Sequence, residues 1–403
     1  MKGRLRGRII GMLVVLSVLP LLSGCWERRE LNQIAFVLGM GIDKTKNGYM
    51  VSMQAVIPSD IEAKGGGGGG TAVALYSCKG STVYEAWRNF TLVSPREGYL
   101  GHVRVLVIGE ELARAGIKET IDALKRSREM RTDYYVMVAK NAKASEVLSV
   151  LTPLEKIPAN SLFSSVSTSN KITGATITVK MDELIDNLVT EGQQAVLTGV
   201  EIEGKPGGGD IKNIQNIRPR TKLRFDNIAV FRKDRLVGWL NRLESIGFSY
   251  ATDRVHANSG AVLGNDRRKI VVEALATHTK RKARIINGKP HIYLQVSLIA
   301  NIEDMQSGMD ITAPGAIAEL EQECEKRVVR LMEMSVDGLI DKYRSDAFGF
   351  GNLIYKADPK AWRKLRKGPA TAYLKNTEVH YAADVLINRV GVTGNSIQHD
   401  VKE

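Results

Sequence analysis

The sequence predicts an α+β, multi-domain protein, with three domains built of mixed sheets packed by helices. Three observations predict this class: a strand–helix–strand pattern in the first half, short alternating strands from residue 195, and one long amphipathic helix after Pro314. We expect the following division: a signal peptide at 1–24, an N-terminal α/β domain with one β-α-β unit at 25–194, a small strand-rich middle domain at 195–264, and a C-terminal, mostly antiparallel sheet with one long helix at 265–403.

The first 24 residues have the parts of a bacterial lipoprotein signal peptide. A basic start is followed by an apolar run over 9–22, which is shorter than the roughly 20 residues that a membrane-spanning helix needs. The run ends in Leu-Ser-Gly followed by Cys25. We expect cleavage before Cys25 and a lipid on its thiol, which anchors the protein to the outer face of a membrane. Several long acyl chains hold firmly, because each buried methylene contributes roughly 0.8 kcal/mol.

The chain is basic, with a formal net charge of +13, of which the signal peptide contributes +4. Much of the rest lies in two clusters: Arg267, Arg268, Lys269, Lys280, Arg281, Lys282 and Arg284 in the first, and Lys360, Arg363, Lys364, Arg366 and Lys367 in the second. Export and the absence of a recognition-helix or stacking-aromatic pattern argue against nucleic acid as a partner. Two alternatives stay open: solvated faces, or contact with anionic lipid head groups or an acidic partner surface.

The N-terminal domain begins with a predicted hairpin. Residues 33–43 are almost continuously apolar, 44–48 form a turn, and 49–57 alternate. The glycine run at 65–70 predicts a mobile loop. It does not fit a phosphate-binding loop, because no Lys-Ser/Thr pair closes it.

The predicted β-α-β unit follows a short helix at 81–91 that has Ser81 as its N-cap. Its parts are a strand at 103–108, one helix over 110–130 and a strand at 134–139. Such a unit places two parallel strands in one sheet, with the helix on one face. Further helices are predicted at 143–154 and 181–190, and the Ser/Thr/Asn-rich residues 161–169 between them read as a loop.

Strands dominate the remainder of the chain. They are predicted at 196–202, 223–231, 236–240, 269–279, 282–286, 292–302 and 378–388. The helix after Pro314 presents apolar side chains at three- and four-residue steps, so we expect it to pack on the last sheet.

No pattern in the sequence indicates catalysis, a cofactor or a metal. The six histidines are scattered and lack paired metal-ligand spacing, and no nucleophile motif precedes a helix. We therefore assign no catalytic, cofactor-binding or metal residues, and expect no enzyme. Cys78 and Cys324 are expected to be buried free thiols, although a bridge between them stays open outside the cytoplasm.

Several blocks together resemble one family. They are GCWERREL from Gly24, GMGID from Gly39, GHVRVLVIGEELA from Gly101, FRKDRLVG from Phe231, and DAFGFG from Asp346 with PKAW from Pro359. This order resembles the Ger(x)C lipoproteins, the C subunits of spore germinant receptors. The chain departs from the family pattern at Glu27, where Asp is usual, and after Trp362, where a Trp-rich continuation is replaced. The glycines of the DAFGFG block are typical of a structural turn, and a ligand loop is the alternative.

The resemblance implies a three-domain body anchored on the spore inner membrane, which acts in nutrient sensing with two integral-membrane receptor subunits and without catalysis. The one functional position that carries over is the lipid attachment site, Cys25. The competing hypothesis is a solute-binding lipoprotein that delivers a small molecule to a transporter. That class predicts two similar doubly wound lobes, and the sequence offers one clear β-α-β unit and a strand-rich second half.

Overall fold

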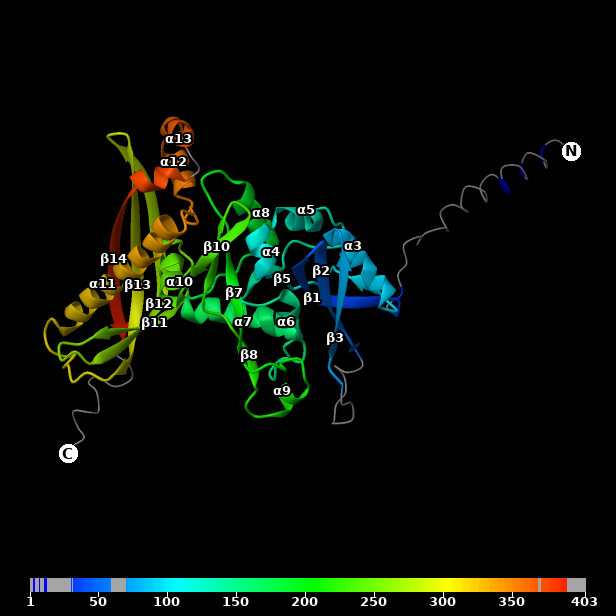
Figure 1. The fold of residues 1–403 in the computed structure, drawn as a ribbon. Coiled ribbons are helices and arrows are strands. Elements are labelled where there is room, and N and C mark those ends of the chain that lie inside the picture. The colour runs from blue at the N-terminus through cyan, green and yellow to red at the C-terminus, as the bar shows by residue number, and fades with distance from the viewer. Residues whose placement is uncertain are drawn as a thin grey trace.

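The computed structural model describes residues 32–58, 70–368 and 371–389, and isolated positions before residue 31. Two sheets with flanking helices form an elongated body, with the N-terminal strands at one end and the last strand, β14, at the other (Figure 1). This arrangement confirms the α+β class with mixed sheets packed by helices. The predicted signal peptide, Cys25 and most of the glycine run lie outside the described residues.

The first sheet has ten strands in the order β10-β9-β7-β6-β5-β1-β2-β3, with β4 paired to β1 and β8 to β7. Their bounds are β1 Ile34–Thr45, β2 Gly48–Val56, β3 Val73–Gly80, β4 Glu97–Tyr99, β5 Val105–Gly109, β6 Tyr135–Lys140, β7 Val196–Gly204, β8 Thr221–Arg224, β9 Ile228–Arg232 and β10 Arg235–Leu240. The hairpin of β1 and β2 and the parallel β5–β6 unit are confirmed. The β1–β5 and β6–β7 pairs are also parallel, so the central run of parallel strands is longer than predicted.

The helices around this sheet correct several predictions. Their bounds are α3 Val83–Arg88, α4 Glu110–Ala115, α5 Lys118–Lys125, α6 Ala144–Ser149, α7 Pro158–Thr173, α8 Met181–Val189, α9 Lys212–Gln215 and α10 Arg242–Ala251. The N-cap of α3 is Thr82 and not Ser81, because the Thr82 hydroxyl accepts the Glu85 N–H while Ser81 donates to the Glu85 carboxylate.

The helix predicted over 110–130 is two helices. Gly116 separates α4 from α5 with φ of +126°, a backbone conformation that side chains disfavour. The Ile117 N–H then bonds the carbonyl of Asp234 at 2.9 Å, so a contact from the distant β9–β10 turn fixes the break.

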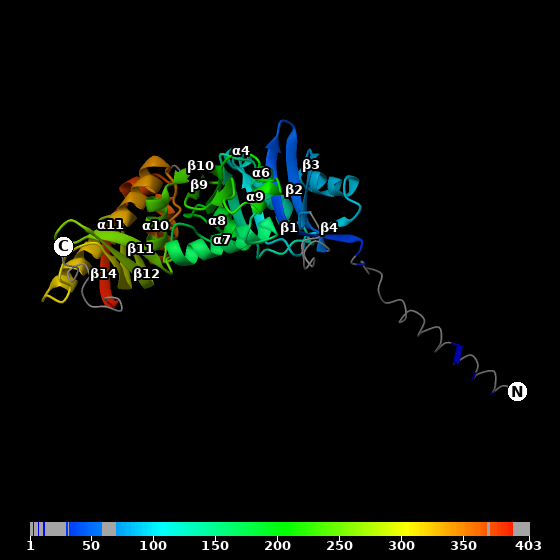
Figure 2. The same ribbon diagram turned by 90° about the horizontal axis from the view of Figure 1, so that it is seen from below.

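The predicted loop at 161–169 is wrong, because these residues lie inside α7. Pro158 starts this helix, and Ala159, Leu162 and Val166 bury one face at three- and four-residue steps. The apolar face outweighed the polar composition of the segment. The helix runs along one side of the molecule from the first sheet to the second (Figure 2).

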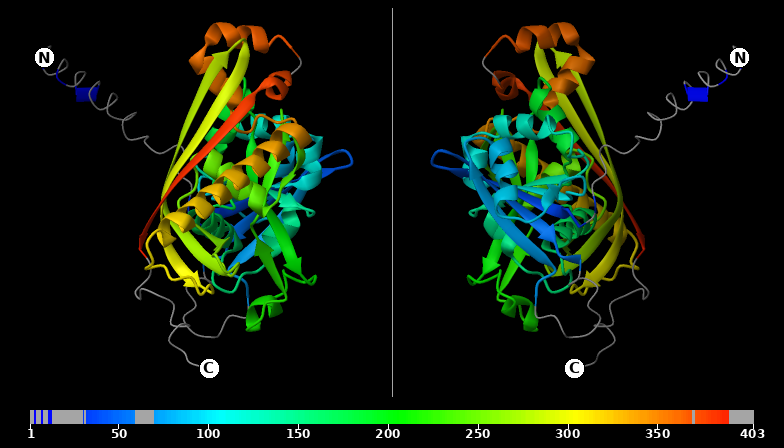
Figure 3. Two further views of the ribbon diagram at one scale, coloured as in Figure 1. Left: turned by 90° about the vertical axis from the view of Figure 1, so that its left-hand side faces the viewer. Right: turned by 90° about the vertical axis from the view of Figure 1, so that its right-hand side faces the viewer.

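The second sheet has the order β11-β12-β13-β14, with bounds Asn258–Leu263, Lys269–Ile286, Lys289–Met305 and Glu378–Arg389. The β11–β12 and β12–β13 pairs are antiparallel and β13–β14 is parallel, as the prediction of a mostly antiparallel sheet requires. The strands predicted at 269–279 and 282–286 are one strand. The long helix α11, Ala316–Asp337, packs on this sheet (Figure 3) and continues into a π-helical turn at Gly338–Lys342. Two short helices follow, α12 Phe350–Ala357 and α13 Pro359–Leu365.

The strands after residue 195 do not form a sheet of their own. β7, β8, β9 and β10 belong to the ten-stranded sheet, and β11 belongs to the four-stranded one. The division into domains at 195 and 264 stays a prediction, but it does not coincide with the boundary between the sheets.

Two hydrogen bonds join the part of the molecule built on the first sheet to the part built on the second. The Ser345 hydroxyl donates to the Phe231 carbonyl at 2.7 Å, and the Tyr343 hydroxyl donates to the Trp239 carbonyl at 2.8 Å. The buried core is continuous across this junction. In the described part of the chain, no helix has the length and apolar character needed to cross a bilayer.

Candidate functional site

The carboxyl ends of the parallel strands bring polar side chains to one edge of the first sheet. Asp43 lies near the end of β1, Glu110 directly follows β5, Lys140 ends β6 and Glu201 lies in β7. In open sheets with parallel strands, this edge is where ligands usually bind.

Asp43 at this edge has a structural role, because its carboxylate binds the start of α6. Its side chain is 3% exposed and accepts the N–H groups of Ala144 at 2.7 Å and Ser145 at 3.0 Å, at the start of α6. A Cβ added to Gly109 would lie 2.1 Å from Asp43 Oδ1, so the glycine makes room for the carboxylate. The GMGID and VIGEEL blocks thus meet in one packed contact.

Glu110 is also held by neighbours. It accepts the Asn141 N–H at 2.5 Å, the Arg114 Nε–H at 2.8 Å and the Trp239 indole N–H at 3.4 Å. Burial raises the pKa of this carboxyl, but the hydrogen bonds from Asn141 and Arg114 outweigh burial and hold the pKa below its ordinary value. Glu110 is therefore ionised at neutral pH and does not serve as a proton donor.

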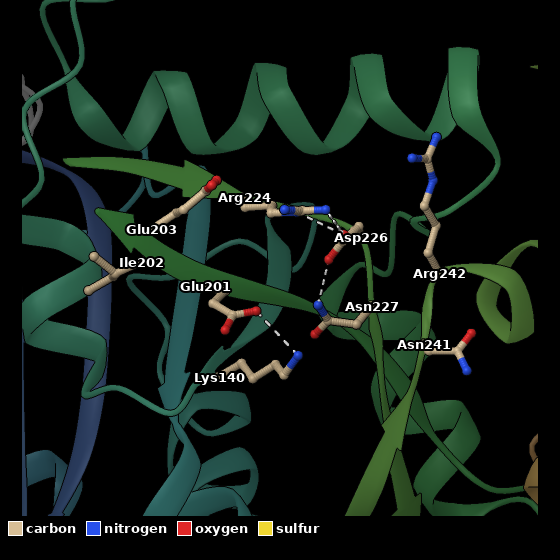
Figure 4. Close-up of a pocket in the computed structure, with 9 residues that line it drawn as sticks. All are labelled: Lys140, Glu201, Ile202, Glu203, Arg224, Asp226, Asn227, Asn241 and Arg242. Atoms are coloured by element: carbon tan, nitrogen blue, oxygen red, sulfur yellow. Dashed lines mark hydrogen bonds and ion pairs between the residues drawn. The ribbon is translucent and has the colours of Figure 1, made fainter. Parts of the chain in front are cut away.

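A pocket of about 320 Å³ lies at this edge of the sheet, and Lys140 and Glu201 are among the residues that line it (Figure 4). The Lys140 ammonium lies 3.2 Å from the Glu201 carboxylate, and Arg224 pairs with Asp226 at 2.8 Å. The remaining polar groups come from Glu203, Asn227, Asn241 and Arg242. Both signs of charge are present and largely paired, so the pocket offers donors and acceptors to a polar ligand. Its lining contains no nucleophile next to a base.

A second cluster of buried polar groups surrounds Asp346, in the DAFGFG block. The carboxylate is 1% exposed and accepts the N–H groups of Phe350 and Gly351, both at 2.8 Å, and the hydroxyl of Tyr373. Burial raises the pKa of Asp346, although these hydrogen bonds oppose the rise. The Tyr373 ring packs edge-on against Trp362, at the place where the chain departs from the family pattern.

The structural reading of the DAFGFG glycines fits the geometry. Gly349 has φ of +70°, and a Cβ on Gly351 would lie 2.5 Å from Gly192 and 2.6 Å from Trp362. Phe348 and Phe350 are buried. The block is a packed turn that closes the junction between the two parts of the molecule.

The other residues singled out in the sequence lie apart from the pocket. Cys78 and Cys324 are both buried and free, which confirms the expectation of unbridged thiols. The side chains of the basic clusters are exposed, except Arg281, which turns inward and donates to the Phe348 carbonyl.

One grouping escaped the sequence analysis. His291, Glu378 and His380 place their ligand atoms within 4.8 Å of one another. The two histidines are 89 positions apart, so no local spacing could reveal them. Their positions in two alternating strands were the available signal, but the register between those strands was not readable.

The fold and its polar clusters define a class: a two-sheet α+β protein whose sequence blocks form packed structural contacts. Comparison with known proteins specifies the family. Residues 27–202 match the model of the spore germination protein N-terminal domain, and residues 226–391 match that of the spore germination B3/GerAC-like C-terminal domain. The chain belongs to this family of spore germination proteins, the Ger(x)C family.

Relatives match along nearly the whole chain. Spore germination protein KC of Bacillus subtilis (strain 168) is 28% identical, with 98% of each chain covered. Spore germination protein B3 of the same organism is 23% identical, with 94% of this chain and 98% of that protein covered. The crystal structure of the GerBC protein has the same fold, with a TM-score of 0.54 at 19% identity over 89% of this chain and 99% of that one.

Proposed function

We propose that the chain is a lipoprotein subunit of a spore germinant receptor, anchored through Cys25 and acting with two integral-membrane subunits in spore germination. The observation that carries this proposal is the end-to-end likeness to spore germination protein KC. Both family models also match in order along the chain, so the likeness is not confined to one domain.

The anchor is proposed from the N-terminal sequence. The basic start, the short apolar run and the Leu-Ser-Gly that precedes Cys25 are what lipoprotein processing requires. Anchoring on the outer face of the membrane, the inner membrane of the spore, places the body next to membrane-embedded partners. The exposed residues of the two basic clusters then offer positive charge to anionic head groups or to an acidic partner surface.

The proposed role is binding and not catalysis. At the carboxyl edge of the first sheet, Asp43, Glu110 and Lys140 are engaged in hydrogen bonds or ion pairs. The two sheets differ in strand number and pairing, which supports a receptor subunit over a solute-binding lipoprotein with two similar lobes.

The test is complementation in a spore-forming host that lacks its own copy of the gene. Wild type, Cys25→Ala and the matched control Cys78→Ala are compared by membrane fractionation, intact mass, co-purification with the two partner subunits and nutrient-triggered germination. We expect wild type and Cys78→Ala to be lipidated, membrane-bound and active, and Cys25→Ala to lose all three properties.

The outcomes separate the parts of the proposal. Unchanged germination in the deletion strain, with the partner subunits intact, would contradict the receptor role. Lipidation without partner co-purification would leave the anchor and contradict the complex. An unmodified wild-type chain in the soluble fraction would contradict the anchor itself.

A further inference from the structure

The parallel pairing of β13 and β14 brings three metal-binding side chains together. His291 lies opposite Glu378, and Tyr293 lies opposite His380. Side chains alternate along a strand, so these residues share one face, while the intervening Ile292 and Leu294 are buried in the core. The group lies near the tip of the long β12–β13 hairpin, away from the pocket of the first sheet.

The distances within this group fit a tetrahedral ion. His291 Nδ1 lies 3.1 Å from His380 Nε2 and 3.5 Å from Glu378 Oε2. Two ligands of a tetrahedral zinc ion, each about 2.0–2.2 Å from the metal, are separated by about 3.3 Å. Two of the three separations are therefore close to the tetrahedral value, and all three ligand atoms lie within 4.8 Å of one another.

We propose that His291, Glu378 and His380 bind a divalent transition-metal ion of the zinc class. Two imidazole nitrogens and one carboxylate oxygen suit zinc better than calcium or magnesium, which prefer oxygen ligands. The group is open to solvent on its carboxylate side, since the Glu378 side chain is 53% exposed and that of His291 is 13% exposed. Ring stacking orients the ligands: Tyr293 and His380 stack with centroids 4.7 Å apart.

Neighbouring positive charge limits the affinity of this site. Arg284 lies opposite His291 in the β12–β13 pair, and its guanidinium carbon is 5.5 Å from the centre of the Tyr293 ring. Lys282 lies opposite Tyr293 on the same face. These cations repel a metal ion, so removing the Arg284 charge tightens binding.

The ion would tie an edge strand to its sheet. Among the strands of the described residues, β14 is the last in the order of the second sheet and pairs with β13 alone. Two of the three ligands, Glu378 and His380, are at the start of β14. Metal binding would therefore hold this end of β14 to His291 of β13. An ion that binds only the folded chain also raises the melting temperature.

The test uses the full-length chain without an affinity tag, purified in detergent and stripped of metal with a chelator. Zn²⁺ binding is measured by calorimetry, and Co²⁺ binding by the visible absorption of a tetrahedral complex. The variants are His291→Ala, His380→Ala, Glu378→Gln and Arg284→Ala. The matched control is His278→Ala, which removes an exposed imidazole of β12 outside the group.

We expect one Zn²⁺ per chain and a tetrahedral Co²⁺ spectrum in wild type and His278→Ala. Affinity should fall at least about tenfold in each ligand variant and rise in Arg284→Ala. The melting temperature in chelator, unchanged in the ligand variants, reports that they fold. No binding by wild type, equal affinity in the ligand variants, or no tightening in Arg284→Ala would overturn the site.

Discussion

The Asp43 carboxylate accepts the backbone N–H of Ala144 at 2.7 Å, across 101 positions of chain. The bond joins the end of β1 to the first turn of α6, where unpaired N–H groups and the helix dipole favour a negative charge. Asp43, the last residue of the GMGID block, therefore caps the N-terminal end of α6 from strand β1.

Removing this cap should destabilise the fold. Asp43→Ala leaves the Ala144 and Ser145 N–H groups without their acceptor and should lower the free energy of unfolding by about 2 kcal/mol. Urea denaturation followed by circular dichroism measures the change. The control Asp182→Ala, in the exposed first turn of α8, should cost no more than about 1 kcal/mol. Equal losses in the two variants would contradict the capping role.

Gly109 and Asp43 should be energetically coupled. An alanine Cβ at 109 would lie 2.1 Å from Asp43 Oδ1, so Gly109→Ala pushes the carboxylate from α6 and should cost about 2–3 kcal/mol. In an Asp43→Ala background the clash is gone, and the same substitution should cost less by at least about 1 kcal/mol. The four chains of this double-mutant cycle are compared by urea denaturation, and additive losses would show that the two residues do not interact.

Asp346 should be a strong determinant of stability. Asp346→Ala leaves the N–H groups of Phe350 and Gly351 and the Tyr373 hydroxyl without an acceptor, and should cost about 3 kcal/mol. Tyr373→Phe removes one donor only and should cost about 1–2 kcal/mol. Chemical denaturation of both variants gives these values, and a larger loss in Tyr373→Phe than in Asp346→Ala would contradict the assignment.

The cost of Asp346→Ala should depend on pH. Burial holds the folded-state pKa of Asp346 above 3.8, its ordinary value, so the folded chain binds the proton more tightly than the unfolded chain. The stability linked to this proton is present below the unfolded pKa and is lost as pH rises through the folded pKa. The loss caused by Asp346→Ala should therefore be larger near pH 4 than at pH 7, as measured by denaturation at both pH values. A larger loss of stability at pH 7 than near pH 4 would contradict a raised pKa of Asp346 in the folded chain.

The two described thiols should resist alkylation in the folded chain. Burial raises the pKa of Cys324 to about 11 and also raises that of Cys78, so little reactive thiolate exists at pH 8. Iodoacetamide followed by peptide mass spectrometry should find both cysteines unmodified under native conditions and modified in denaturant. Rapid labelling of Cys324 in the folded chain would contradict its burial.

Local patterns in the sequence were sufficient to predict those helices and strands whose structure depends on their own residues. Alternation and a short turn predicted the β1–β2 hairpin, and apolar side chains at helical steps predicted α11. The sequence predictions failed where a contact with a distant residue ends a helix, or where the apolar face of a helix was not recognised. Gly116 ends α4, next to the hydrogen bond between Ile117 and Asp234. Helix α7 forms because Leu162 and Val166 are buried on its apolar face.

The candidate sites divide in the same way. The sequence by itself determined the family resemblance and the expectation of a lipid on Cys25, because each depends on residue identity and order along the chain, whereas the structure decided that Cys78 and Cys324 are unbridged. Only the tertiary structure decided which side chains meet: Lys140 with Glu201, Asp346 with Tyr373, and His291 with His380. The reason is physical, since the register between strands is set by packing across the whole sheet, and one residue of slip would turn His380 to the opposite face.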